Sequence, residues 1–260
     1  MRCICLHDKK EIENYLRKDV FLNIYAIGDL DDFFWPNTTW YGFQSSGNIS
    51  AIALIYTGQL IPTLNALSCE GDVDMAKLLE SMRPILPNRF YAHLSPGLAN
   101  ILETTHNLES KGEHYKMALM DKNRTVAADV SGVERLGKQD ATSMQALYKE
   151  SYPGNWFDPR MLETNKYFGI KENGCLVCIA GVHVYSPEYR VAALGNITTL
   201  PECRGMGFAT RVTARLCQSL ADEGMDVGLN VKVDNAAAIA CYQRIGFKIV
   251  ASYEEYLVTS

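Results

Sequence analysis

Hydrophobic and polar positions along the first half of the chain follow two periods. Alternation of apolar and polar residues predicts strands, and apolar residues that recur every three or four positions predict helices. The predicted strands cover residues 2–6, 39–44, 49–57, 63–68, 90–94 and 115–120, and the predicted helices cover 8–17, 20–30 and 74–86. This pattern describes an α/β unit of about 120 residues, an ordinary domain size.

A second unit of similar pattern follows a polar, small-residue stretch from Met120 to Gly132, which is typical of a linker. After it come a short strand, a turn in which Asp140 is a candidate helix cap, and a helix. The later predicted strands cover 167–171, 175–185, 190–200, 227–233 and 248–258, and the later helices cover 208–223 and 236–245. We therefore expect two α/β domains, 1–125 and 126–260, which share an order of elements but no repeated residue motif.

Composition and charge narrow the function classes. The 260 residues are 47% hydrophobic and 21% charged, which is typical of a globular protein. The 25 Lys and Arg against 30 Asp and Glu give a net charge of −5, which argues against a general nucleic-acid binder. No apolar run reaches the roughly 18 residues that span a bilayer, and the N-terminus becomes charged too early for a signal peptide. We expect a cytoplasmic protein with no membrane partner, whose eight scattered cysteines are reduced.

The most informative stretch is a glycine-rich turn between an apolar strand and a helix. The apolar face of that helix carries Phe208, Val212, Leu216 and Leu220. Glycines at 205 and 207 allow close backbone approach, and the helix start adds a partial positive charge, so the turn suits an anion such as a pyrophosphate. Arg204 could add a cation. The alternative is a helix that simply follows a flexible glycine turn.

Two other nucleotide-binding folds use similar turns. A P-loop requires Gly-Lys-Ser/Thr, whereas Gly207 is followed by Phe208. A Rossmann fingerprint fits better, because Gly205 and Gly207 are correctly spaced and Asp234 follows the next strand. However, Thr210 stands where that fingerprint needs Gly or Ala, and only 26 residues follow Asp234, too few for the remaining βαβ units.

Two motifs taken together resemble the GNAT superfamily of N-acetyltransferases. The family's Arg/Gln-x-x-Gly-x-Gly/Ala loop and its later Asn-x-x-Ala…Tyr-x-x-x-Gly-Phe helix match here at Arg204, Gly207 and Ala209, and at Asn235, Ala238, Tyr242, Gly246 and Phe247. The resemblance covers roughly residues 130 to 258. The stretch TLPECRGMGFAT is also similar to a subgroup related to glycine N-acyltransferases.

The resemblance implies a fold of two tandem GNAT-like mixed-sheet domains, of which the second carries the acetyl-CoA loop. In the first half GDVDMAKLLES stands where the loop would be, so that half would be a degenerate copy. Acetyl-CoA would be the cosubstrate, with no metal. Backbone groups of Ile197, Thr198 and Thr199 would pair with the pantetheine arm and hold the thioester carbonyl. The loop that would cradle the pyrophosphate is Arg204, Gly205, Met206, Gly207, Phe208, Ala209 and Thr210.

The same resemblance assigns two further residues of the second motif. Tyr242 would protonate the departing thiolate, because a phenol keeps its proton at neutral pH. Its alternative is a helix tyrosine packed against the sheet. Asn235 would either cap the following helix or bond the coenzyme.

The general base departs from the best-known pattern. Several family members carry a Glu four residues ahead of the position that matches Ile197, and here that residue is Ala193. His183 and Glu202 are chemical substitutes, and water relayed through backbone groups is a third option. His183 has the right ordinary pKa for a base, although a lone strand histidine is often structural.

The sequence therefore predicts an acetyl-CoA-dependent N-acetyltransferase in which an amine attacks the thioester directly, and we expect that amine to belong to a small molecule. The acceptor is not identified, and a homodimer is compatible with the pattern. The alternative is a coenzyme-A-binding regulatory or scaffold protein without turnover, as suggested by Ala193 and by the first half that lacks the loop.

Overall fold

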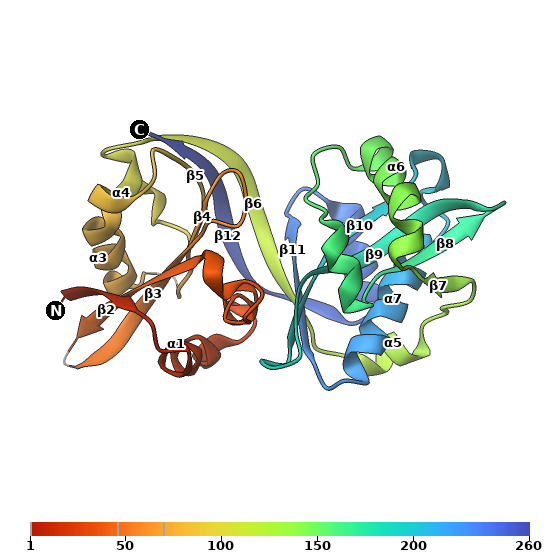
Figure 1. Cartoon of the computed structure of the whole chain (residues 1–260), viewed down its shortest axis with the longest axis horizontal. Helices are drawn as coiled ribbons and strands as arrows, with labels where there is room; N and C mark the ends of the chain where they lie inside the picture. The colour runs from red at the N-terminus through yellow and green to blue at the C-terminus, as the bar shows by residue number, and fades with distance from the viewer. Residues whose placement is uncertain (1, 46, 70) are drawn as a thin grey trace. The chain divides into compact units, whose positions relative to one another are not determined.

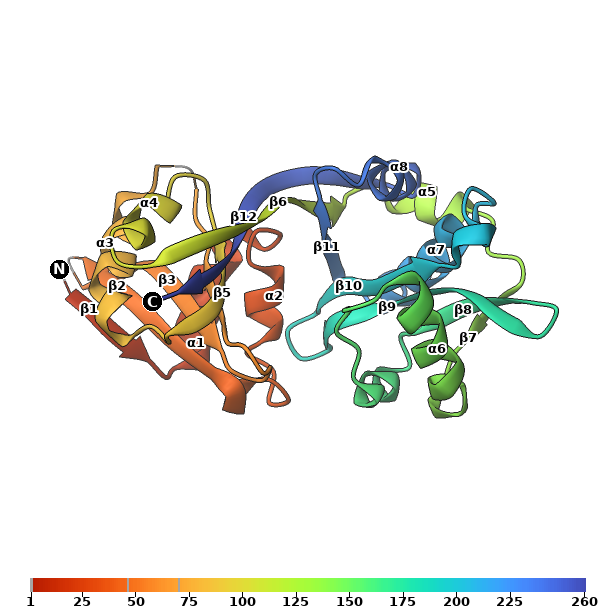
Figure 2. The ribbon, with the colours of Figure 1, turned by 90° about the horizontal axis from the view of Figure 1, so that it is seen from above.

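A computed structural model describes residues 2–45, 47–69 and 71–260 (Figures 1 and 2). The chain forms two compact units, Met1–Lys116 with Val250–Ser260, and Met117–Ile249. The last strand of the chain therefore belongs mainly to the first unit. None of the described helices has the length and apolarity needed to cross a membrane.

The first unit is a mixed sheet with helices. In chain order its elements are β1 (Arg2–Leu6), α1 (Lys9–Leu16), η1 (Arg17–Asp19), α2 (Ile24–Gly28), η2 (Trp35–Asn37), β2 (Thr38–Ser45), β3 (Asn48–Tyr56), β4 (Thr63–Ala66), α3 (Val73–Met82), η3 (Arg83–Ile85), β5 (Arg89–Leu94), α4 (Ala99–Glu103) and β6 (Asn107–Leu119). The strand order is β1-β2-β3-β4-β5-β12-β6, where β12 is the final strand (Phe247–Thr259). β4 and β5 are parallel, and β12 runs antiparallel to β5.

The core of the first unit lies between this sheet and α3. Alternate residues of β5, namely Phe90, Ala92 and Leu94, are fully buried, as the two-residue period of a strand requires. They join a cluster that includes Met75 and Leu79 of α3. These contacts bury one face of the sheet.

The second unit repeats the arrangement. Its elements are α5 (Lys122–Ala127), β7 (Val133–Arg135), η4 (Lys138–Asp140), α6 (Ala141–Ser151), η5 (Pro159–Thr164), β8 (Phe168–Glu172), β9 (Cys175–Ser186), β10 (Val191–Thr199), η6 (Pro201–Cys203), α7 (Phe208–Ala221), β11 (Asp226–Lys232) and α8 (Ala236–Arg244). The strand order is β11-β10-β9-β8-β7, with β10 and β11 parallel. All four predicted apolar residues of α7 are buried, which confirms that helix face.

Some local predictions were wrong. The stretch predicted as a linker contains α5, where Thr125 is fully buried and donates a hydrogen bond to the Ile245 carbonyl at 2.7 Å. Asp140 is the N-cap residue of α6, as predicted, although its carboxylate accepts from Gly137 N and Lys171 Nζ rather than from an N–H group of α6. The helix α4 was not predicted. A division of folding domains at residue 125 stays a prediction, and that residue falls inside α5.

Candidate active site

The pairing of two parallel strands in the second unit ends shortly before the residues predicted to hold the pantetheine arm. The register of β10 with β11 runs from Val191↔Asp226 to Leu194↔Leu229 and ends there. Beyond that point β11 diverges from β10 (Figure 2). The remaining part of β10, which includes Ile197 to Thr199, is therefore not paired with β11 in the register of the two strands.

A β-bulge interrupts the pairing of β10 with β9 in this same part of β10. Against β9 the register passes from Gly195↔Gly181 to Thr198↔Ile179, so β10 contains one extra residue. Within the bulge Asn196 has a φ of 55°, in the left-handed region that Asn tolerates better than most residues. The bulge lies directly at Ile197, which was predicted to hold the thioester carbonyl.

The predicted phosphate loop leaves the start of α7 open. Gly205 and Gly207 have φ values of 78° and 80°, and Gly207 caps α7 without a side chain. A Cβ on either glycine would meet nothing within 4 Å. Among the described residues, no group accepts a hydrogen bond from the backbone N–H groups of residues 205–210. The first N–H groups of a helix lack intrahelical partners, so this turn offers a set of donors for an anion.

Hydrogen bonds connect this loop to its neighbours. Arg204 Nε donates to the Thr199 carbonyl at 3.3 Å, which ties the loop to the end of β10. Thr210 Oγ1 lies 3.3 Å from Cys241 Sγ on α8. The structure therefore brings the predicted strand, loop and second motif together.

The second motif occupies α8 and the turn after it. Asn235 Oδ1 accepts from Ala238 N at 3.1 Å, which confirms its role as a helix cap and leaves a bond to the coenzyme as a prediction. The side chain of Tyr242 is buried, with its ring centre 6.0 Å from that of Phe247. Gly246 has a φ of 110°, and a Cβ there would collide with the backbone oxygen of Asp121.

His183 is half-buried on β9 beside the bulge. Its Nε2 lies 3.1 Å from Asn196 Oδ1, and its ring lies 6.0 Å from that of Trp156. Burial lowers the pKa of His183, and the hydrogen bond with Asn196 opposes part of that effect. The imidazole is therefore neutral at neutral pH, as a base must be. Ala193 stands where several family members carry a Glu, and its side chain is fully buried.

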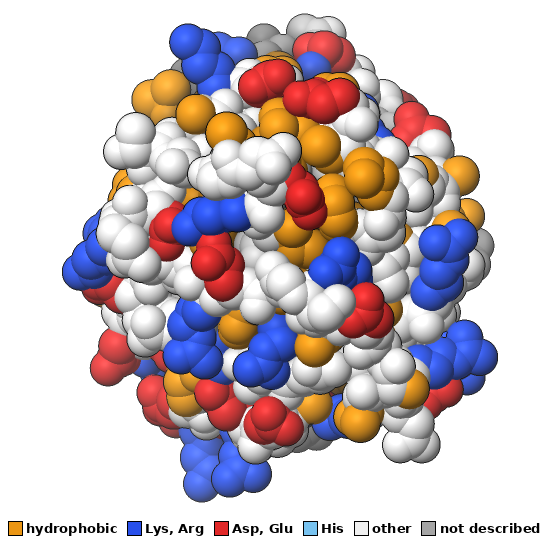
Figure 3. Space-filling view, turned by 90° about the vertical axis from the view of Figure 1, so that its right-hand side faces the viewer, with side chains coloured by type: hydrophobic (Ala, Val, Ile, Leu, Met, Phe, Trp, Pro, Cys, Tyr) orange, Lys and Arg blue, Asp and Glu red, His pale blue; other side chains and the backbone are white. Residues whose placement is uncertain are grey.

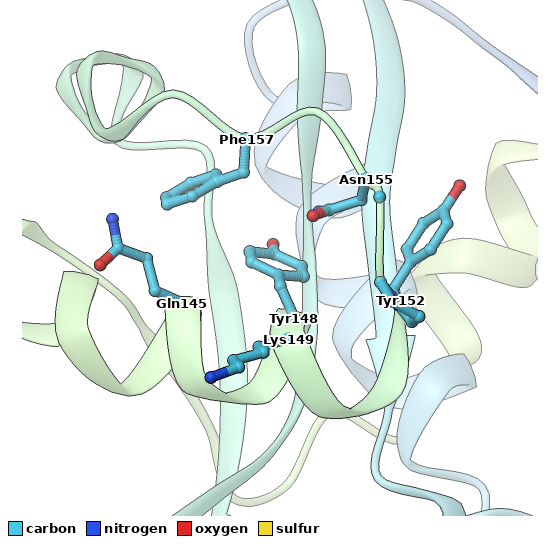
Figure 4. Close-up of a pocket in the computed structure, with 8 residues that line it drawn as sticks. Gln145, Tyr148, Lys149, Tyr152, Asn155 and Phe157 are labelled. Atoms are coloured by element: carbon cyan, nitrogen blue, oxygen red, sulfur yellow. The ribbon is translucent and has the colours of Figure 1, made fainter.

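A pocket of about 170 Å³ opens between α6 and the loop that follows it (Figure 4). It is lined by Gln145, Tyr148, Lys149, Tyr152, Pro153, Gly154, Asn155 and Phe157. Two of these residues contact the bulge, because Tyr148 OH donates to the Asn196 carbonyl at 3.0 Å and Asn155 Nδ2 donates to Asn196 Oδ1 at 3.1 Å. The pocket is thus joined by hydrogen bonds to the residue before Ile197.

Sequence reasoning missed Asn196 and the tyrosines that hold it. A signal was present, because Gly195-Asn196 interrupts an otherwise apolar strand, and such a glycine often marks a bulge. The partners Tyr148 and Tyr167 come from distant parts of the chain, so no local pattern could have connected them.

In the described part of the first unit, neither the separation of the parallel strands nor the open helix start is present. The parallel register of β4 with β5 extends to Ala66, the last residue of β4. Beyond it, Ser95 Oγ donates to the Ser68 carbonyl and accepts from Ser68 N, both at 2.9 Å. The start of α3 is capped by the carboxylate of Asp72, which accepts from Asp74 N and Met75 N. A negative side chain at that helix start opposes the binding of a phosphate.

The face in Figure 3 carries basic and acidic side chains interspersed around apolar ones. Within the described part of the chain, no three His, Cys, Asp or Glu side chains are grouped so that they could hold a metal ion.

The second unit thus combines an open helix start with two parallel strands that separate, and known proteins with similar sequences and structures indicate its class. Residues 136–247 match the family model described as "Acetyltransferase (GNAT) family". A mycothiol acetyltransferase of Paenarthrobacter aurescens is 30% identical over 97 residues, which cover 36% of this chain and 29% of that protein. The match therefore spans less than a third of that relative's length.

Solved structures show the same fold over the whole chain. A Drosophila protein aligns with a TM-score of 0.74 at 12% identity, covering 99% of this chain and 98% of that one. A tandem GNAT protein from the clavulanic acid biosynthesis pathway aligns with a TM-score of 0.57 at 16% identity, covering 98% and 97%. Residues 136–247 are a GNAT acetyltransferase domain, and the expected α/β fold of two GNAT-like halves is confirmed.

Proposed function

We propose that this chain is an acetyl-CoA-dependent N-acetyltransferase that acts on a small amine. One observation carries the proposal: in a GNAT domain, the open N–H groups at the start of α7 lie next to the end of β10, where β11 has separated from it. Backbone donors at a helix start suit the pyrophosphate of the coenzyme. The unpaired end of β10 would receive the pantetheine arm along Ile197, Thr198 and Thr199.

The chain would bind one molecule of coenzyme, in its second unit. The loop from Arg204 to Thr210 would hold the pyrophosphate, and Asn235 would bond the coenzyme as well as cap α8. The first unit would bind no coenzyme A, because Asp72 occupies its helix start and Ser68 and Ser95 bridge the strand ends.

Transfer would follow direct attack by the neutral amine. The C–N bond forms as the amine attacks the thioester carbon, the amine proton passes to a base, and the C–S bond breaks. His183, neutral at neutral pH, is suited to take that proton, and Tyr242 to give one to the departing sulfur. The backbone at the bulge would orient the thioester carbonyl.

Two buried cysteines, Cys178 and Cys241, support direct attack over an intermediate on either of them. Cys178 Sγ lies 3.1 Å from Thr199 Oγ1, but burial raises the pKa of Cys178 to about 12. Burial also raises the pKa of Cys241, which contacts Thr210. Since the thiolate is the nucleophile, these protonated thiols are poor acyl acceptors.

The pocket beside the bulge supports a compact acceptor. Its volume of about 170 Å³ is below the range of drug-sized ligand sites, so it suits an amine of few heavy atoms. The eight cysteines are free, which fits a reducing compartment, and we propose a cytoplasmic location.

A thiol-release assay tests the proposal. Acetyl-CoA and the full chain are incubated with a panel of amino acids, polyamines and amino sugars. Acetylated products are identified and quantified by mass spectrometry. We expect thiol release that depends on one class of amine and equals the product formed. Coenzyme A binding without thiol release for any amine would instead indicate a regulatory protein without turnover.

A further inference from the structure

The bulge residue Asn196 is held more tightly than a strand residue requires. Its side chain is 2% exposed, and its backbone is left-handed. Its amide lies within hydrogen-bond distance of Asn155 Nδ2, His183 Nε2 and Tyr167 OH. A buried amide with this many partners has its orientation fixed by them.

The backbone carbonyl of Val182 determines which group donates and which accepts in each of these hydrogen bonds. Tyr167 OH donates to the Val182 carbonyl at 2.9 Å, and a carbonyl can only accept. With its proton used, the Tyr167 oxygen accepts from Asn196 Nδ2 at 2.9 Å. The other end of the amide is therefore the oxygen, and His183 must donate to it from Nε2.

This sequence of bonds fixes the tautomer of His183. A neutral imidazole with its proton on Nε2 carries its lone pair on Nδ1. Among the described residues, no hydrogen bond to Nδ1 is present, so the lone pair stays available. The ring also packs on the backbone of Gly195, where any Cβ would collide with it.

We infer that Asn196 is a positioning residue, which holds His183 in the Nε2–H tautomer so that Nδ1 serves as the general base. The inference rests on the proposed function. Trp156, Gly195 and Asn196 face the ring, and among the described residues burial and the hydrogen bond with Asn196 are the causes that shift the pKa of His183.

Two substitutions separate this role from a structural one. Asn196→Asp keeps a residue that tolerates a left-handed backbone and puts a carboxylate beside Nε2, which favours the imidazolium. We expect the acidic limb of the pH profile of kcat/KM to move to higher pH by about one unit or more. Asn196→Gly removes the hydrogen bond to His183 without backbone strain. For this variant we expect the acidic limb to move to lower pH and kcat to fall at least about tenfold. Asn173→Asp is the matched control, because Asn173 is also left-handed (φ 51°) but lies in the β8–β9 turn.

The inference is overturned if the wild-type chain turns over and neither Asn196 variant moves the acidic limb, or if Asn173→Asp moves it equally. A readout without turnover is nitrogen NMR of the imidazoles, with His183 assigned by its loss in His183→Gln. We expect the proton on Nε2, and a proton on Nδ1 would overturn the inference. An absence of thiol release with every amine would contradict the proposed function, while the NMR result would still decide the tautomer.

Discussion

Replacement of Gly207 by Val tests the phosphate loop. With a φ of 80° at this position, a side chain costs about 1–2 kcal/mol and more when it is β-branched. A Cβ there would touch nothing in the protein within 4 Å, so no collision with the fold adds to that cost. The valine methyl groups would instead occupy the space in which an anion reaches the N–H groups of α7.

The strain alone predicts a loss of affinity. If the loop relaxes to a new conformation, recovering the open one costs about 1–2 kcal/mol, which weakens coenzyme A binding about 5- to 30-fold, and the methyl groups add to that loss. Gly224→Val is the matched control, since Gly224 has a φ of 70°, also meets nothing within 4 Å, and lies after the end of α7. Calorimetric titration with coenzyme A and thermal unfolding are measured on both variants. Equal affinity of Gly207→Val and the parent, or an equal loss in Gly224→Val, would refute the assignment.

Three further substitutions follow from the site. Tyr242→Phe should lower turnover about 10²-fold with little change in acetyl-CoA affinity, as loss of a general acid does; unchanged turnover would make Tyr242 structural. His183→Ala should lower turnover and remove the acidic limb of the pH profile of kcat/KM. In the parent this limb should lie below pH 6.5, the ordinary histidine pKa, because burial lowers the pKa of His183. A limb that is retained in the variant belongs to another group. Gly246→Ala should cost at least about 2 kcal/mol in urea unfolding, since its φ of 110° and the Asp121 oxygen both exclude a Cβ, and full stability would contradict this packing.

The loop and the second motif could be predicted because their chemistry is local. Glycine positions, the helix start and the apolar face of α7 all lie within about twenty consecutive residues. The cap role of Asn235 likewise needs only its own helix. These features follow from backbone geometry that nearby residues determine.

Other parts depend on contacts between distant segments. The last strand pairs with β5, with Glu254 opposite Leu94, and no alternation of residues along either strand indicates that partner. The bulge depends on the hydrogen bonds that Asn196 makes with side chains far along the chain. α5 was hidden because its polar residues also suit a linker, and its burial comes from one threonine.

Initial rates over a matrix of acetyl-CoA and amine concentrations test the central claim most directly. Direct attack requires both substrates on the enzyme together, so double-reciprocal plots should intersect and thiol release should need the amine. Parallel lines, with acetylated protein formed in the absence of amine, would contradict the account.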